Sequence, residues 1–494
     1  MQATGTMADR EWWQARRFAV LAVLLACVPL AYPPLPPLTD ALDHVGRYRT
    51  MLDGGAGPLA QWYTVQWRVV GNLGVDAVVA LFGPLIGLEP TVKLAAIAIV
   101  ALTVTGCLAI SRVAHGRVTP YTLFALPLAY NHVFHMGFLN YTLAMALALN
   151  AFALWLWMAG SRWRPWAFIP IALTIWGAHV FGWAVLGLLA FAAEWSRRGN
   201  PVRAGLACWP LAAPLPLMLL WRAASSGATF DFLHLQSKAI ALLMSFRDTW
   251  FTIDVLTLAV VVAAIVHGLR RAGSDRAAGW AAIALLAAFI ALPIWLMGSA
   301  LADTRAAPFV LILALLALRP GDAVKARTVA LVGTAFFVVR IGVTTVSLAL
   351  ASHAQAREAQ ALDHIPYGAR VVQFASPDCG NGWGMSRLEH IGGLAQARRR
   401  AFTNSQWPDI GASLLTTHYP AARPFENDPT HLLLCDGGTG LARRLAAFPR
   451  DAFDRLWLVD IPEGAPAALP GMTRLWAGGN SAVYRIDRGP TLRA

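Results

Sequence analysis

Ionisable side chains gather in a short stretch that follows the first apolar segment of the chain. Asp40, Asp43, His44 and Arg47 are spaced i, i+3, i+4 and i+7, which places them on one face of a helix. Thr39 precedes them and is predicted to cap that helix. A carboxylate can take a proton from a hydroxyl group, and cationic side chains can stabilise a departing anion. Asp40, Asp43 and His44 are therefore candidate catalytic residues.

The same carboxylates also have a structural explanation. An acidic side chain at the start of a helix is stabilised by the free backbone N–H groups and by the helix dipole. From the sequence alone, Asp40 or Asp43 is as consistent with a helix cap as with a catalytic base. Both interpretations stay open.

The composition identifies the elements that must position these residues. The chain has 494 residues, of which 57% are hydrophobic and 14% charged, and its mean hydropathy is +0.52. Such a chain is a polytopic helical membrane protein, with membrane lipids as its surroundings. Its net charge of +13 does not indicate a nucleic-acid partner, because the Lys and Arg residues fall largely in short loops between apolar segments.

The loop arginines also predict the topology. Arg16 and Arg17 keep the N-terminus in the cytoplasm, so that the span at residues 18–32 delivers a first outer loop at residues 33–68. We expect about eleven crossings in a transmembrane domain at residues 1–351. They include a full crossing at 91–112, hairpins at 120–157 and 166–195, a crossing at 204–220, and four later spans at 253–267, 279–297, 308–318 and 328–351. Residues 59–88 are predicted to form a juxtamembrane helix and a short span.

Further polar residues fall at the predicted outer ends of helices, where polar groups beside a bilayer usually mark a functional cavity. Each also has an alternative interpretation: an interfacial imidazole for His135, a hydrogen-bonded core histidine for His179, and an exposed loop pair for Asp303 and Arg305. No metal ligand is assigned, although a divalent cation is an open alternative. The candidate substrate-binding residues are Arg47, His135, Asn140, His179, Asp303 and Arg305.

The composition changes after residue 351. Charges and Gly-rich turns appear, and the apolar runs shorten to strand length, as in RVVQFA, HLLLCD, RLWLVDI and SAVYRI. Residues 352–494 are therefore predicted to form one α/β domain outside the cytoplasm. Cys379 and Cys435 lie in this soluble region, where we expect a disulfide between them.

The motifs PPLTDALDHVGR and GFLNYTLAMALAL resemble those of the GT-C superfamily of integral-membrane glycosyltransferases. The resemblance implies a many-helix membrane core with an outer C-terminal α/β domain. It also implies that Asp40 matches the first-loop acid, which serves as catalytic base or as a metal ligand, with Asp43, His44 and Arg47 completing the motif. Basic residues bind the phosphate of the donor in that superfamily, and Arg305 is a positional candidate. The directly adjacent second acid of some members is absent here.

The function that the resemblance implies is inverting transfer of a sugar from a polyprenyl-phosphate donor to a glycan or lipid acceptor. The reaction would occur on the outer face of a bacterial inner membrane. One alternative is a flippase or polymerase for lipid-linked saccharides, although the sequence contains no internal repeat of the transporter kind. Another is a non-catalytic protein of envelope assembly. Replacing Asp40 by Asn discriminates among these functions, because it abolishes product formation only in an enzyme.

Overall fold

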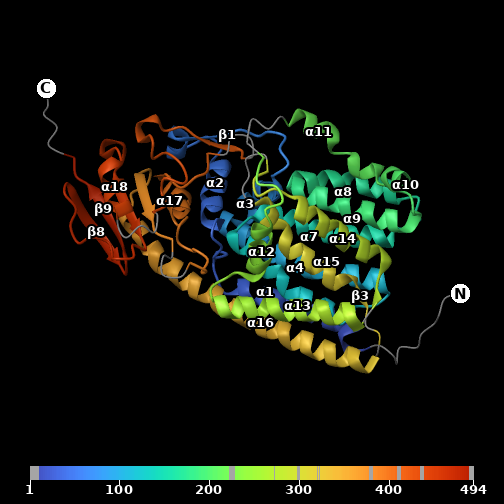
Figure 1. The fold of residues 1–494 in the computed structure, drawn as a ribbon. Helices are drawn as coiled ribbons and strands as arrows, with labels where there is room; N and C mark the ends of the chain where they lie inside the picture. The colour runs from blue at the N-terminus through green and yellow to red at the C-terminus, as the bar shows by residue number, and fades with distance from the viewer. Residues whose placement is uncertain are drawn as a thin grey trace.

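A helical bundle followed by a five-stranded sheet makes up the protein (Figure 1). The computed structural model describes residues 11–221, 229–271, 273–296, 301–319, 321, 323–377, 382–408, 413–433 and 439–488. The helices of the bundle are α1 (Arg16–Ala31), α3 (Gly74–Ile86), α4 (Leu88–His115), α5 (Thr122–Ala125), α6 (His132–Met136), α7 (Leu139–Trp157), α8 (Arg164–Ala178), α9 (Val180–Arg198), α10 (Pro201–Ala207), α11 (Leu215–Leu220), α12 (Leu235–Leu243), α13 (Phe251–Arg271), α14 (Arg276–Ala291), α15 (Ala302–Ala317) and α16 (Ala323–Glu358).

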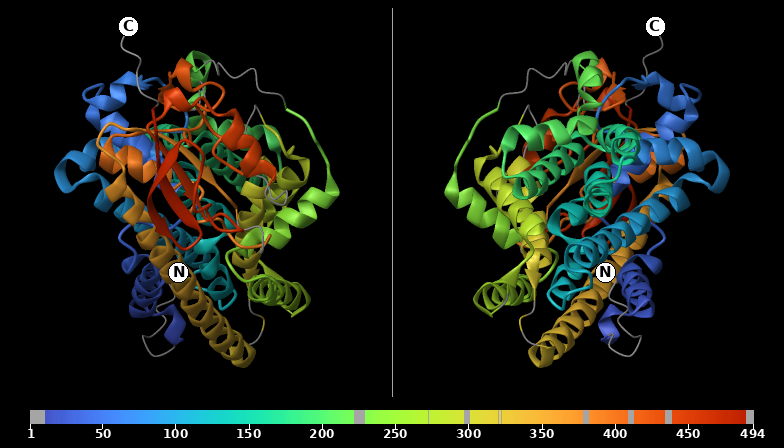
Figure 2. Two further views of the ribbon diagram at one scale, coloured as in Figure 1. Left: turned by 90° about the vertical axis from the view of Figure 1, so that its left-hand side faces the viewer. Right: turned by 90° about the vertical axis from the view of Figure 1, so that its right-hand side faces the viewer.

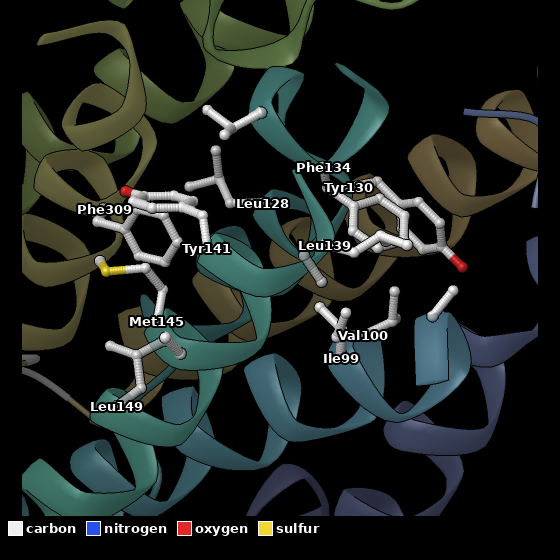
Figure 3. Packing of buried hydrophobic residues seen from close by; sticks show 14 of the residues in the cluster. Ile99, Val100, Leu128, Tyr130, Phe134, Leu139, Tyr141, Met145, Leu149 and Phe309 are labelled. Carbon is white, nitrogen blue, oxygen red and sulfur yellow. The ribbon is translucent and has the colours of Figure 1, made fainter. Parts of the chain in front are cut away.

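Four helices of the described residues are long and apolar enough to cross a membrane. They are α4, α7, α13 and the segment 325–364, which contains most of α16. The most enclosed of them is α7, which packs against α4 and α9 and has 83% of its apolar window buried. Figure 3 shows this packing, with Ile99 and Val100 of α4 near Leu139 of α7, and Tyr141 beside Phe309. The helical membrane class is confirmed, whereas the number of eleven crossings remains a prediction.

Two segments, one predicted as a crossing and one as a hairpin, consist of shorter helices than expected. Residues 204–220 form two short helices, α10 and α11, separated by a turn at Trp209–Ala212, because Pro210, Pro214 and Pro216 lack the N–H that a continuous helix needs. Residues 120–157 form the short α5 and α6 before the single long α7, rather than a hairpin of two spans. The hairpin at 166–195 forms as α8 and α9, which meet at His179, whereas its crossing of the membrane remains a prediction.

A mixed sheet forms the part of the chain after α16. Its strands lie in the order β5 (Phe402–Thr403), β4 (Arg370–Ala375), β7 (Arg455–Val459), β9 (Ser481–Ile486) and β8 (Met472–Gly478). Both neighbours of β4 run parallel to it, and β9 runs antiparallel to β7 and β8. The same part of the chain contains the helices α17 (Gly392–Arg399) and α18 (Thr439–Ala447). The left view of Figure 2 has the sheet toward the viewer.

Three of the four predicted strands are confirmed, namely β4, β7 and β9. The HLLLCD segment differs: its only described ladder contact is an isolated bridge between Leu432 and Ala375. Residues 379 and 435 lie outside the described residues, so the Cys379–Cys435 disulfide remains a prediction. Helix α16 continues through residue 351 to Glu358, and the predicted domain boundary at 351/352 remains a prediction as well.

Residues 33–68, predicted to form the first outer loop, fold onto the C-terminal part of the chain. Helix α2 (Ala41–Asp53) packs on α17, and β1 (Tyr63–Val65) pairs antiparallel with β6 (Leu415–Thr417). The prediction of a juxtamembrane helix around residue 63 is therefore wrong, although α3 does form the short apolar helix expected after it. A methyl group added at Gly393 would lie 2.1 Å from the carbonyl oxygen of Leu42. Glycine thus allows the two helices to meet backbone to backbone.

Candidate active site

Asp40 is the residue that immediately precedes α2, but its side chain does not cap that helix. Its backbone N–H donates to the carbonyl oxygen of Met136 at 2.9 Å. Gly137 adopts a left-handed conformation with φ of +92°, and a methyl group there would lie 3.0 Å from the Asp40 nitrogen. The Asp40 carboxylate is therefore available for another role. Thr39, predicted as the cap, instead donates its hydroxyl group to the carbonyl oxygen of Ser386 at 2.7 Å.

His390 lies between the acidic side chains of α2 and its own neighbour Glu389. Its Nδ1 is hydrogen-bonded to a carboxylate oxygen of Asp43. Its Nε2 lies 3.6 Å from a carboxylate oxygen of Asp40 and 3.7 Å from one of Glu389. Burial alone would lower the pKa of His390, but the charge and hydrogen bond of Asp43 outweigh it and raise the pKa to about 10. The imidazole ring is therefore positively charged at neutral pH.

Asp43 holds this imidazolium from a completely buried position. The hydroxyl group of Ser405 donates to its other carboxylate oxygen at 2.7 Å. The side-chain amide of Gln406 donates to its backbone carbonyl at 2.9 Å. Both carboxylate oxygens are thus engaged, so the predicted catalytic Asp43 is arranged to orient His390.

The surroundings of Asp40 raise the pKa of its carboxyl group toward neutrality. Burial raises the pKa of its carboxyl group, the nearby His390 charge lowers it, and Glu389 raises it again, so that the pKa is about 7. The side chain keeps 12% of its surface exposed, compared with none for Asp43. A carboxylate with a pKa near neutrality can both accept and release a proton under physiological conditions.

Asp40, Glu389 and His390 also resemble a metal-binding set, because their ligand atoms all lie within 4.8 Å of one another. The hydrogen bond from Nδ1 to Asp43 would orient Nε2 toward a cation. A metal, however, needs the neutral imidazole, whereas the Asp43 carboxylate stabilises the protonated ring. Metal binding by this set would therefore require His390 to lose its proton.

His44 stacks with aromatic side chains at the edge of this cluster. Its ring centroid lies 4.9 Å from that of Trp407, and the Trp407 ring lies 5.3 Å from that of His390. Burial, and then the charge of Arg47, keep the pKa of His44 well below its ordinary value. His44 is therefore a neutral ring at neutral pH, and its catalytic role stays a prediction.

Arg47 and Asn140, predicted to bind substrate, meet at a buried carboxylate. The Arg47 guanidinium donates to the two oxygens of Asp76 at 2.6 and 3.2 Å. The Asn140 amide donates to Asp76 at 2.9 Å and to the carbonyl oxygen of Asn72 at 2.7 Å, and it accepts from the N–H of Val75 at 2.7 Å. These hydrogen bonds hold α2, α3 and α7 together, so both side chains have a structural function.

His179 and Arg305 lie near each other through Tyr141. The His179 side chain caps α9 by accepting from the N–H of Phe181 at 3.1 Å, and its ring makes an edge contact with Tyr141 at 5.4 Å. The Tyr141 hydroxyl group donates to the carbonyl oxygen of Arg305 at 2.7 Å. The Arg305 guanidinium lies 4.7 Å from the ring centroid of Phe138. Phe138 follows Gly137, whose backbone contacts Asp40, so Arg305 lies near the Asp40 segment.

Asp303 and His135 take part in buried ion-pair networks. Asp303 accepts from Lys238 at 3.0 Å and from Ser237 at 2.7 Å, so the alternative of an exposed loop pair with Arg305 is wrong. Arg387 contacts Nδ1 of His135 and the carboxylate of Asp248, at 3.0 and 2.7 Å. The second network anchors the segment before His390 to the helical bundle.

Several residues of the site were not anticipated from the sequence. The segment 387–390 brings Arg387, Glu389 and His390, and the segment 405–407 brings Ser405, Gln406 and Trp407. The one signal was the density of ionisable groups in RLEH, which nothing local connects to α2. The segment is fixed by long-range bonds, including one from the Gln355 side chain to the carbonyl oxygen of Arg387 at 2.8 Å.

No protein-family model and no curated protein matches the chain. Among solved structures, the chain is similar to the crystal structure of ArnT from Cupriavidus metallidurans bound to undecaprenyl phosphate. The sequence identity is 13%, the TM-score is 0.49, and the match covers 95% of this chain and 97% of that chain. At this level of similarity, no residue role, substrate or activity is transferred from ArnT to this protein.

Proposed function

We propose that the protein is a membrane glycosyltransferase that moves a sugar from a polyprenyl-phosphate donor to a hydroxyl group of a glycan or lipid acceptor. The proposal rests mainly on Asp40, whose side chain does not cap α2 and whose carboxylate lies 3.6 Å from the His390 imidazolium. The sequence motifs that resemble GT-C enzymes supply the reaction class, and the contacts of Asp40 and His390 supply the chemistry.

In the proposed reaction, Asp40 accepts the proton of the acceptor hydroxyl group. The acceptor oxygen forms a bond to C1 of the sugar while the bond from C1 to the phosphate oxygen breaks, which inverts the configuration. The polyprenyl phosphate leaves with the electron pair of the broken bond. A base with a pKa of about 7 suits this step, because a substantial fraction of it is ionised at neutral pH and the ionised form has high affinity for the proton.

His390 and Asp43 act together on that base. The imidazolium charge stabilises the ionised form of Asp40, and Asp43 holds the ring with Nε2 toward Asp40. A fixed cation beside the base also suits stabilisation of the phosphate as its negative charge develops. Asp43 is accordingly proposed as a positioning residue. A divalent cation could bind Asp40, Glu389 and His390 only in place of the His390 proton, and it would then supply Lewis-acid stabilisation of the same charge.

Donor binding is proposed to involve Arg305. Its guanidinium lies over Phe138, next to the backbone of Gly137 that contacts Asp40, which connects a phosphate-binding cation to the base. Arg47 is a weaker candidate, because both oxygens of Asp76 already bind its guanidinium. The donor site is proposed to open toward the outer leaflet, with the sheet on the same side of the membrane.

Mass spectrometry of envelope glycans and lipids tests the proposal. A strain that lacks the gene is expected to lose one sugar substituent and to accumulate the corresponding polyprenyl-phosphate sugar. The purified protein should then convert that lipid to polyprenyl phosphate when the acceptor is added. Identical glycans and lipids in the two strains would overturn the proposal. Accumulation of the lipid with no conversion by the purified protein would instead favour a flippase.

A further inference from the structure

A polar cavity lies at the end of the helical bundle that is opposite to the sheet. Its volume is about 320 Å³, and it is lined by the last turns of α4, α7 and α9 and by the first turn of α14. Figure 1 places β3 (Leu318–Arg319) on the far side of the molecule from β8 and β9, and β3 pairs with residues 273–274, which lie directly before the first turn of α14. The cavity is therefore separate from Asp40 and His390. Its polar lining residues are Ser196, Arg197, Asp275 and Arg276.

The ion pairs around the cavity leave an excess of positive charge. Glu194 faces Arg164, Arg197 and Arg198 at 2.8, 3.6 and 2.7 Å. Asp275 is paired with Arg319 at 2.7 Å and also caps α14 by accepting from the N–H of Ala278. Arg276 lines the cavity with an exposed side chain, and among the described residues no ion pair engages its guanidinium. Five guanidinium groups thus face two carboxylates, which favours an anionic ligand.

Aromatic side chains indicate the depth of this cavity in the membrane. Trp195 and Trp280, on α9 and α14, lie with ring centroids 5.3 Å apart, and each keeps more than a third of its surface exposed. Trp157, next to the cavity residue Leu156, is 71% exposed. Exposed tryptophans at helix ends concentrate at the level of the lipid headgroups. The cavity is therefore at the height where a phosphodiester of a membrane lipid lies.

We infer that this cavity binds the headgroup of an anionic phospholipid, with Arg197 and Arg276 as the cations for its phosphodiester. Basic pockets between membrane helices recognise anionic lipids in this way, because the guanidinium fork matches two phosphate oxygens. The tryptophans favour a lipid over a free anion, since they place the site beside acyl chains. Such a lipid would hold α9 and α14 together at a fixed depth and is not a substrate.

Native mass spectrometry of the full-length protein in neutral detergent tests the inference with phosphatidylglycerol and phosphatidylethanolamine as probes. We expect saturable binding of one phosphatidylglycerol and weaker binding of the zwitterionic lipid. The double variant Arg197→Gln/Arg276→Gln should weaken phosphatidylglycerol binding by about fivefold for each arginine removed. The matched control is Arg112→Gln/Arg270→Gln, which removes two exposed arginines of α4 and α13 that do not line the cavity.

The experiment separates the site from general electrostatic attraction. Equal weakening in the control variant, equal binding of the two lipids, or displacement of the lipid by inorganic phosphate would each overturn the inference. Arg276→Lys retains the charge and should recover most of the affinity that Arg276→Gln loses. Arg276→Gln alone changes one exposed side chain, so it provides the same comparison if the double variant does not fold.

Discussion

Nε2 of His390 lies 3.6 Å from a carboxylate oxygen of Asp40, while Nδ1 of the same ring is hydrogen-bonded to Asp43. One imidazole ring from the C-terminal part of the chain therefore connects two acidic residues near the start of α2. The two acidic residues differ in their contact with this ring. Asp43 is completely buried and orients the ring, whereas Asp40 is partly exposed and lies close to its positive charge. This division of roles leads to predictions that can be measured separately.

The first prediction concerns the dependence of the rate on pH. The value of kcat/KM should rise as the pH increases through about 7, where Asp40 ionises, and should fall as the pH passes about 10, where His390 loses its proton. The His390 charge lowers the pKa of Asp40, so the His390→Gln variant should show its rise at a higher pH. An unchanged rise in that variant would show that His390 does not act through Asp40.

A second prediction concerns divalent cations. We expect full activity after treatment with a chelator, because the protonated His390 ring does not offer Nε2 as a ligand. Metal analysis of the purified protein provides the second readout. Loss of activity that is restored by one particular cation would contradict the prediction and would make Asp40, Glu389 and His390 the metal ligands.

The close packing of α17 on α2 gives a third prediction. The Gly393→Ala variant should be less stable by about 1–3 kcal/mol, because the added methyl group overlaps the carbonyl oxygen of Leu42. It should also lower activity, since α17 begins two residues after His390. Gly342→Ala is the control, because a methyl group there meets no atom within 4 Å. Thermal unfolding in detergent measures both, and equal stability of the two variants would contradict the proposed role of this contact.

The buried ion pair between Arg47 and Asp76 gives a fourth prediction, which separates a structural role of Arg47 from a role in substrate binding. Arg47→Ala should cost about 3–5 kcal/mol of stability, because it leaves the buried Asp76 carboxylate without its cation. The double variant Arg47→Met/Asp76→Leu removes both charges and should recover most of that stability. If the folded double variant also retains its affinity for the donor, Arg47 is structural. Loss of donor affinity in a stable double variant would restore Arg47 as a substrate-binding residue.

The sequence predicts the local parts of this architecture well, because they depend on local patterns. The apolar runs of strand length in RVVQFA and SAVYRI predict β4 and β9, and the apolar run before Arg112 predicts α4. Spacing alone places Asp40, Asp43 and His44 on a helix, which α2 confirms for the two residues inside it, Asp43 and His44. In each case the determining residues lie within one or two turns, or one strand length, of each other.

The partners of those residues could not be predicted, because they depend on tertiary contacts. His390 follows Asp43 by 347 positions, and no pattern around RLEH indicates that it meets α2. The pairing of β1 with β6 is equally remote, since three residues after a glycine-containing loop carry too little signal to define a strand. Arg47 shows the converse problem: its position on the correct helix face does not reveal that Asp76 already binds it.

The most direct test of the central claim is the rate of sugar transfer by the Asp40→Asn variant, with Glu389→Gln as the matched control. The substrate is the lipid-linked sugar that accumulates in the deletion strain, and the readout is release of polyprenyl phosphate. Asparagine retains the shape of Asp40 but cannot accept the proton, so we predict a rate lower by roughly 10²–10⁴ with donor binding preserved, and a much smaller effect of Glu389→Gln. Near-normal turnover by Asp40→Asn would contradict the account, and an inactive Glu389→Gln in the same assay would transfer the role of base to Glu389.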